Sequence, residues 1–225
     1  PARAEPSAAR DPEWRVTYPS QNGRFYFNPG VPEARAFVED SMLEAVEKYD
    51  VDGVHFDDFF YPYPEDGEDF PDDAAFAAHN RGIPDKGDWR RDNVNLLVKE
   101  MSERIKAIKP WVKFGISPFG IWRNQGTDPE GSDSRGLQAY DEIYADTRTW
   151  VREGWLDYIV PQLYWNIGFD RADYARLLPG GRRRWPGPAC SCGSARPTTA
   201  PVRPVSGRNR TSSASNSRST ARIPR

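Results

Sequence analysis

Residues 24–64 read RFYFNPGVPEARAFVEDSMLEAVEKYDVDGVHFDDFFYPYP and change their hydrophobic period twice. Arg24–Phe27 predicts a short strand, and Asn28-Pro29-Gly30 predicts a turn. From Pro32, which suits a first helical turn, apolar side chains recur at helical spacing at Phe37, Val38, Met42, Ala45, Val46 and Tyr49. Val51–Asp57 predicts a second strand. The stretch is therefore a strand–helix–strand unit of the kind that builds a parallel α/β sheet.

The same order continues to about residue 178. We expect a helix capped by Asp88 and ending near Ile108, a strand at Trp111–Ser117, a helix at Tyr140–Glu153, a strand at Leu156–Tyr164 and the start of a helix within Asp170–Leu178. Long polar loops follow the strands and short ones follow the helices, which is typical of a (β/α) barrel. An open doubly wound sheet is the alternative, but its usual Gly-rich first turn is missing. We expect an α/β fold, a partial (β/α)8 TIM barrel of about four βα units, because a complete barrel takes about 250 residues.

The charge is divided unevenly along the chain. The 225 residues carry a formal net charge of −2, but residues 180–225 hold ten Arg and no Lys, Asp or Glu, which leaves residues 1–179 at −12. The composition predicts three parts: an N-terminal loop segment at 1–23, the partial barrel at 24–179, and a disordered Arg/Ser/Pro-rich tail at 180–225. The tail has too few large apolar residues to offset chain entropy.

Composition also excludes several classes of protein. No apolar run approaches the roughly 20 residues of a membrane span, and an acidic body argues against a nucleic-acid-binding core. The two cysteines, Cys190 and Cys192, lie in the tail, so a disulfide scaffold and a thiolate metal site are excluded from the body. We expect no cofactor, no nucleic-acid partner and no membrane span, and the sequence gives no oligomeric state.

The sharpest candidate site is the stretch DGVHFDD at residues 52–58. Alternation along a strand points His55 and Asp57 into the barrel. Asp57 then stands at the C-terminal mouth of its strand, where barrel enzymes carry catalytic groups, and Asp58 begins the adjoining loop. Two neighbouring carboxylates repel when both are ionised, and such a pair suits acid/base chemistry. Loop capping or pairing with Arg is the structural alternative. We expect Asp57 and Asp58 to be catalytic.

Polar and aromatic side chains follow the next two predicted strands. Arg and Asn offer directional donors that grip sugar hydroxyls, and aromatic faces stack on sugar rings. Packing within the loop is the alternative for Trp122 and Arg123. The substrate-binding residues we expect are His55, Asn28, Tyr61, Trp122, Arg123, Asn124, Gln162, Tyr164 and Trp165.

A metal site is disfavoured by the spacing of the possible ligands. His55 and His79 lack helical spacing, and the acidic run between Glu65 and Asp73 lacks the ligand spacing of an EF-hand. We therefore expect no metal ligand and interpret the run as a solvated loop. It belongs to the polar stretch Tyr61–Lys86, which is too long for a plain connector and is predicted to be functional.

Five motifs carry a family resemblance: NPGVPEAR at 28–35, YDVDGVHFDDFFYPYP at 49–64, WRRDNVN at 89–95, FGISPFGIWRN at 114–124 and LDYIVPQLYW at 156–165. Together they closely resemble the bacterial glycosyl hydrolase-like family 10, from about Pro12 to Leu178. The resemblance implies a TIM-barrel glycosidase-like domain that acts on glycans and is secreted or held in the cell envelope. More distantly, it resembles glycosidases with Gly-x-polar-x-Asp on the fourth barrel strand, which makes Asp57 the expected catalytic carboxylate.

The chain departs from the family pattern at both ends. We expect the first barrel strands to precede Pro1, and family members continue after Leu178 with a helix and a further strand. The tail instead has the Arg, Cys, Pro, Ser and Gly content that an out-of-frame reading of GC-rich coding DNA produces. Our hypothesis is that everything after Pro179 is a frameshift product. The rival interpretation is a basic arm that binds nucleic acid or anionic lipid, although the tail lacks aromatic interleaving.

The sequence therefore predicts a glycoside hydrolase-like domain that hydrolyses O-glycosidic bonds of a bacterial or environmental polysaccharide through carboxylate acid/base catalysis. Asp57 is expected to act as nucleophile or base. The proton donor is either Asp58 or a carboxylate on a strand outside this chain. A non-catalytic carbohydrate-binding remnant and a metal-dependent hydrolase are the alternatives.

Overall fold

The computed structural model describes residues 14–17, 25–65 and 67–178, which contain a parallel three-stranded sheet of order β3-β4-β5. The strands are β3 at Gly53–Phe56, β4 at Lys113–Ile116 and β5 at Tyr158–Ile159. His55 is opposite Gly115, and Gly115 is opposite Tyr158, so these three residues form one row across the sheet. The α/β class with a parallel sheet is confirmed.

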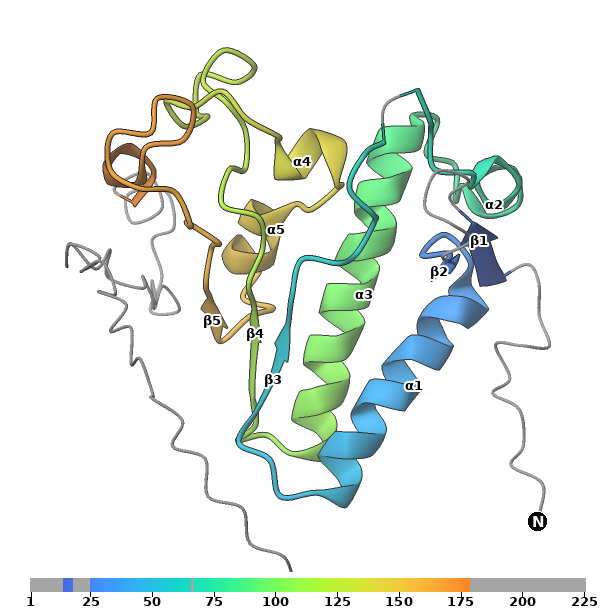
Figure 1. Cartoon of the computed structure of the whole chain (residues 1–225). Helices are drawn as coiled ribbons and strands as arrows, with labels where there is room; N and C mark the ends of the chain where they lie inside the picture. The colour runs from blue at the N-terminus through green and yellow to red at the C-terminus, as the bar shows by residue number, and fades with distance from the viewer. Residues whose placement is uncertain (1–13, 18–24, 66, 179–225) are drawn as a thin grey trace, which may run out of the picture. The chain divides into compact units, whose positions relative to one another are not determined.

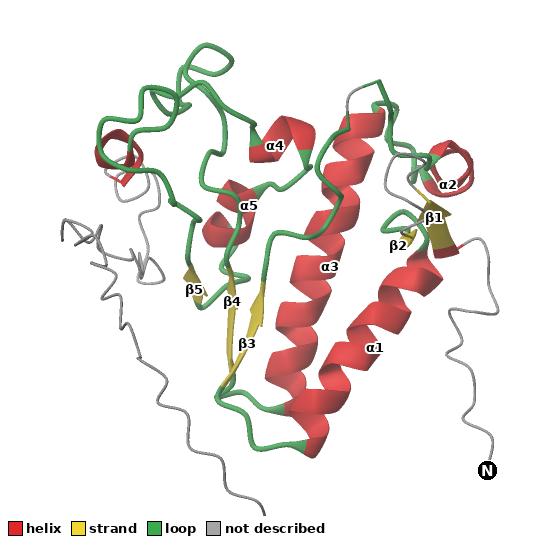
Figure 2. Ribbon diagram, in the orientation of Figure 1, coloured by secondary structure: helices red, strands yellow, loops and turns green. Residues whose placement is uncertain are grey.

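Helices connect the strands and cover one side of the sheet (Figure 1; Figure 2). The helices are α1 at Pro32–Lys48, α2 at Asp73–His79, α3 at Lys86–Ile108, α4 at Ala139–Glu142 and α5 at Thr147–Arg152. The long helices α1 and α3 pack against each other, and α3 also packs against α5. In the described part of the chain, no helix is long and apolar enough to cross a membrane.

The core lies between the sheet and these helices. Phe114, Ile116 and Ile159 point away from the row of His55 and are fully buried. They pack with apolar side chains of the helices at Leu43, Val46, Val94, Val98, Met101, Ile105 and Trp150. The buried apolar side chains of α3 therefore form the side of this helix that faces the core, because burying apolar area is what fixes a helix against a sheet.

Two helix predictions need correction. The N-cap of α3 is Asp85, whose carboxylate accepts the backbone N–H of Asp88 at 2.7 Å, so Asp88 lies inside the first turn. The single helix predicted at Tyr140–Glu153 is two short helices, α4 and α5. Tyr144 between them has φ 57°, a left-handed conformation that a continuous helix does not tolerate. Asp146 then caps α5 by accepting the N–H of Thr149.

The strand predicted at Arg24–Phe27 forms, but it does not join the parallel sheet. It is β2 at Phe25–Phe27, paired antiparallel with β1 at Arg15–Thr17. These two strands lie on the far side of α3 from β3 (Figure 1). The expectation of a loop was thus wrong at residues 15–17. Alternation shows that a segment is extended but carries no information about its pairing partner. The predictions for residues 180–225 lie outside the described residues.

Candidate functional site

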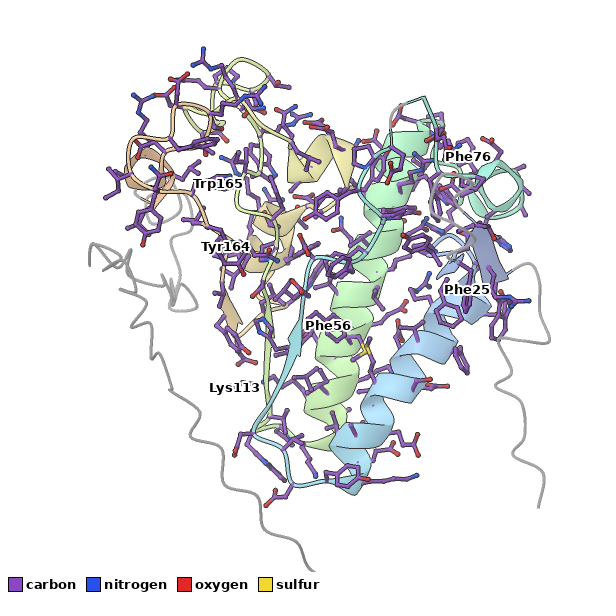
Figure 3. The ribbon with its side chains drawn as sticks, viewed as in Figure 1. Phe25, Phe56, Phe76, Lys113, Tyr164 and Trp165 are labelled. Atoms are coloured by element: carbon purple, nitrogen blue, oxygen red, sulfur yellow. The ribbon has the colours of Figure 1, made fainter. Side chains whose placement is uncertain are left out.

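The carboxyl ends of the three parallel strands meet at one edge of the sheet. The backbone ladder continues past the strands, because Ser117 N–H donates to the Phe56 carbonyl at 2.8 Å and Gln162 N–H to the Pro118 carbonyl at 2.9 Å. Tyr164 and Trp165 lie at this end, whereas Lys113 lies at the opposite end (Figure 3). The edge is where α/β proteins carry their ligand sites.

Asp57 stands directly after β3 and is exposed. Its Oδ1 accepts two hydrogen bonds, from the Asp58 backbone N–H at 3.0 Å and from Gln162 Nε2 at 2.7 Å. Within the described residues, no donor reaches the other oxygen, Oδ2. The carboxylate is thus held by one oxygen and open at the other.

Asp58 has a different environment although it is the next residue. It is 3 % exposed, and its Oδ2 accepts a short hydrogen bond from the hydroxyl of Tyr63. Burial, together with this contact to Asp58, raises the pKa of Tyr63, so its hydroxyl keeps its proton at neutral pH. The two predicted catalytic carboxylates therefore differ in access. Asp57 is exposed and accepts a hydrogen bond from the side-chain amide of Gln162, whereas Asp58 is buried and accepts one from the Tyr63 hydroxyl.

His55 lies below Asp57 on the same face of the sheet. Its Nδ1 is hydrogen-bonded with the Tyr158 hydroxyl at 2.9 Å, and its Nε2 with Ser117 Oγ at 2.7 Å. Burial raises the pKa of Tyr158, and Asp157 raises it further. Sequence reasoning did not select Ser117 or Tyr158. The alternation along the strand that selected His55 would have found both, because it places Tyr158 of β5 and Ser117, just after β4, on the same face of the sheet as His55.

The loop after β4 holds three of the predicted substrate-binding residues. The polar groups of two of them, Arg123 and Asn124, are hydrogen-bonded to neighbouring residues of the protein. Arg123 forms a two-pronged pair with Asp141, at 2.9 and 2.5 Å, and also contacts Asp128 at 3.1 Å. Asn124 Oδ1 accepts from Ser134 Oγ at 2.8 Å. Their polar groups are thus committed to holding the loop.

Trp122 has a packing role in the same loop. Its ring lies under the Arg148 guanidinium at 3.6 Å and contacts Tyr140 edge-on. The structure gives Trp122, Arg123 and Asn124 no contact with Asp57, and it shows why local patterns selected them: planar donors and aromatic faces also suit loop packing.

The other predicted aromatic residues divide into two groups. Trp165 contacts Phe119 edge-on, and Phe119 contacts Tyr63 in the same way, so these rings form an aromatic wall that reaches Asp58 through the Tyr63 hydroxyl. Tyr164 is 81 % exposed. Tyr61, in contrast, is buried and accepts a hydrogen bond from Asn93 Nδ2 at 3.2 Å, and burial raises its pKa.

Asn28 lies away from the sheet, at the end of β2. It is buried, and its Oδ1 accepts the Gly30 N–H at 3.0 Å. Trp89 packs against Gly30 so closely that a Cβ there would lie 2.3 Å from the indole. Asn28 closes this turn and is not brought together with Asp57.

The acidic run after β3 was expected to be solvated, and for Asp72 this is wrong. Arg90 Nη2 donates to Asp72 Oδ1 at 2.6 Å, and Arg90 also bonds Asp69 and the Phe70 carbonyl. Lys86 also contacts Asp69 and Asp72, and it contacts Asp73 as well. These pairs attach the loop to α3. Among the described residues, no group of three or more His, Cys, Asp or Glu could hold a metal ion.

A cavity of about 350 Å³ lies between β2, α1 and α3. Its lining is mostly apolar, with Phe25, Val38 and Leu97 among the residues, and includes neither Asp57 nor Gln162. The cavity is thus separate from Asp57, and its mostly apolar lining offers few of the polar partners that a sugar needs.

The described residues thus form an α/β protein with an exposed carboxylate at the carboxyl edge of a parallel sheet, the edge at which barrel enzymes carry their active sites. Residues 2–179 match the sequence profile of the family Glycosyl hydrolase-like 10, and the chain belongs to that family.

Two similar proteins carry the name glycosyl hydrolase. Glycosyl hydrolase YngK of Bacillus subtilis (strain 168) is 51 % identical over 169 residues, which is 74 % of this chain and 32 % of that protein. Glycosyl hydrolase DigH of Escherichia coli (strain K12) is 47 % identical over 151 residues, which is 67 % of this chain and 34 % of that protein. The chain thus spans about a third of the length of these relatives.

Proposed function

We propose that the chain is part of a (β/α)8-barrel glycoside hydrolase that hydrolyses O-glycosidic bonds of a polysaccharide, with Asp57 as the reacting carboxylate. The observation that carries this proposal is the state of Asp57: exposed at the strand end, fixed through Oδ1 and open at Oδ2. Family membership and the names of the relatives support the reaction class.

The barrel part of the proposal is supported by the two faces of the sheet. The face with Phe114 and Ile159 is covered by helices, whereas the other face carries the polar side chains of His55, Asp57 and Gln162. Polar residues at the strand ends, inside a ring of parallel strands, are the usual site of a barrel enzyme. Further strands would close the ring over this face.

Glycoside hydrolysis needs two carboxyl groups and passes through an oxocarbenium-like transition state. Asp57 Oδ2 would attack the anomeric carbon, or deprotonate the water that does so. The second group protonates the leaving oxygen and must keep a proton until then. Asp58, buried beside Tyr63, is one candidate, and a carboxyl group on a strand outside this chain is the other. The wall of Tyr63, Phe119 and Trp165, with the exposed Tyr164, would stack on the sugar rings.

The test is reducing-end release by the purified chain from a panel of bacterial cell-wall glycan, chitin oligosaccharides and plant polysaccharides. The matched variants are Asp57→Asn and Asp50→Asn, the latter at an exposed position at the end of the turn after α1. We expect hydrolysis by the wild type and by Asp50→Asn, and a loss of about 10²-fold or more in Asp57→Asn. Glycan binding without hydrolysis by the wild type would instead favour a non-catalytic carbohydrate-binding protein.

A further inference from the structure

One row of side chains crosses the open face of the sheet, and a glycine makes room for it. His55, Gly115 and Tyr158 are in register on β3, β4 and β5. A Cβ at Gly115 would lie 2.2 Å from the Tyr158 ring, so the ring occupies the space where a side chain would be. The Tyr158 ring thereby stacks on the His55 imidazole, with centroids 5.6 Å apart and planes 14° apart.

Both ring nitrogens of His55 are hydrogen-bonded within the protein. Nδ1 bonds the Tyr158 hydroxyl and Nε2 bonds Ser117 Oγ, at 2.9 and 2.7 Å. An imidazole has two hydrogen-bonding nitrogens, so His55 has none left for a sugar hydroxyl unless one of these bonds breaks. The arrangement suits a residue that holds Ser117 in place better than one that binds substrate.

Gln162 connects Ser117 to Asp57. Its Nε2 donates to the Ser117 carbonyl at 2.8 Å and to Asp57 Oδ1 at 2.7 Å. A carboxylate and a carbonyl can only accept, so the two hydrogens of the amide are both used and its orientation is fixed. Both hydrogens of the Gln162 amide, like both ring nitrogens of His55, are therefore hydrogen-bonded within the protein.

We propose that Gln162 and His55 are positioning residues: Gln162, braced on the Ser117 carbonyl, holds Oδ1 of Asp57 so that Oδ2 faces the substrate, and His55 fixes Ser117 from below. This inference rests on the proposed function for the role of Asp57 and deepens it. It replaces the expectation that both side chains bind sugar. A carboxylate that can rotate freely spends less time in a reactive orientation, and a displacement of about 1 Å costs on the order of 10²-fold in rate.

The first measurement needs no turnover. In the ¹⁵N-labelled full chain, the Gln162 side-chain amide is assigned by its loss in Gln162→Met. We expect its protons to exchange with water about tenfold more slowly than those of the exposed Gln125. This protection is lost in Asp57→Ala and reduced in His55→Phe. His79→Phe is the matched control, because His79 is the other of the two histidines and lies half-buried in α2, which is not part of this row. An unprotected amide in the wild type, or protection unchanged in both variants, overturns the proposal.

The second measurement separates positioning from sugar binding. On any glycan that the wild type hydrolyses, Gln162→Met is expected to lower kcat by about 10²-fold with KM within about twofold. A raised KM with unchanged kcat would show that Gln162 binds sugar and would overturn the proposal. If the amide is protected but the wild type hydrolyses nothing, the proposed function fails. If hydrolysis is seen and the amide is unprotected, the positioning role fails.

Discussion

Arg90 and Asp72 form a pair between α3 and the loop after β3 in which both side chains are almost fully buried. Arg90 Nε and Nη2 donate to the two oxygens of Asp72 at 2.9 and 2.6 Å, and the Asp72 side chain is 0 % exposed. The Tyr144 ring lies 5.0 Å from the guanidinium carbon. The pair thus fixes the loop that follows the catalytic candidates.

Removing the cation of this pair should be costly. In Arg90→Met, Asp72 is left as a buried charge with one fewer partner, and we expect a loss of about 3–5 kcal/mol in the free energy of unfolding. Urea unfolding followed by circular dichroism measures it. Lys99→Met removes an exposed pair with Glu103 and should change stability by less than about 1 kcal/mol. Equal effects for the two variants would show that burial does not matter here.

Glu39 should make stability depend on pH. Burial and the neighbouring Glu100 carboxyl group together raise its pKa to about 7, against the opposing effect of Arg104. The folded state therefore holds a proton on Glu39 that the unfolded chain has released above about pH 4.5. Because the folded state binds more protons in this window, the free energy of unfolding falls as pH rises from about 4.5 to 7.

Urea unfolding of the wild type and of Glu39→Gln at pH 5 and pH 8 checks this sign. The glutamine cannot ionise, so the variant should lose less stability than the wild type on going to pH 8. Glu44→Gln is the control. The pKa of Glu44 is lowered by Lys48, so its contribution changes below this window. Parallel pH profiles for wild type and Glu39→Gln would contradict the prediction.

Asn28 should matter for folding and not for glycan binding. It is buried, and Asn28→Ala leaves the Gly30 N–H without its acceptor. The expected loss of stability is about 1–3 kcal/mol, with oligosaccharide affinity unchanged in isothermal titration calorimetry. If Asn28→Ala weakened oligosaccharide binding and left the free energy of unfolding unchanged, Asn28 would be a substrate-binding residue and the prediction would be wrong.

Tyr164 should show the opposite behaviour. Its side chain is largely exposed beside the aromatic wall, so Tyr164→Ala should weaken oligosaccharide binding by about 0.5–1.5 kcal/mol and leave unfolding unchanged. Tyr49→Ala is the matched control, because Tyr49 is also exposed but follows α1. Binding that is equally affected by both variants would mean that Tyr164 has no particular role.

The sequence allowed the strand–helix order and the face of β3 that carries Asp57 to be predicted, because both depend on local periodicity. Partners that are distant in the chain could not be predicted. Nothing near Phe25 indicates that it pairs with Thr17, and nothing near Arg123 indicates that Asp141 occupies its guanidinium. The break at Tyr144 was also missed, since a left-handed φ at a tyrosine has no sequence signal.

Chemical rescue of Asp57→Gly tests the central claim most directly. The variant has room for a small anion where the carboxylate stood, so formate or azide can take over its role on an activated glycoside. We predict that Asp57→Gly loses hydrolysis and that added formate restores it, whereas chloride at the same ionic strength does not. Hydrolysis that persists in Asp57→Gly without any added anion would contradict the assignment of Asp57 as the reacting carboxylate.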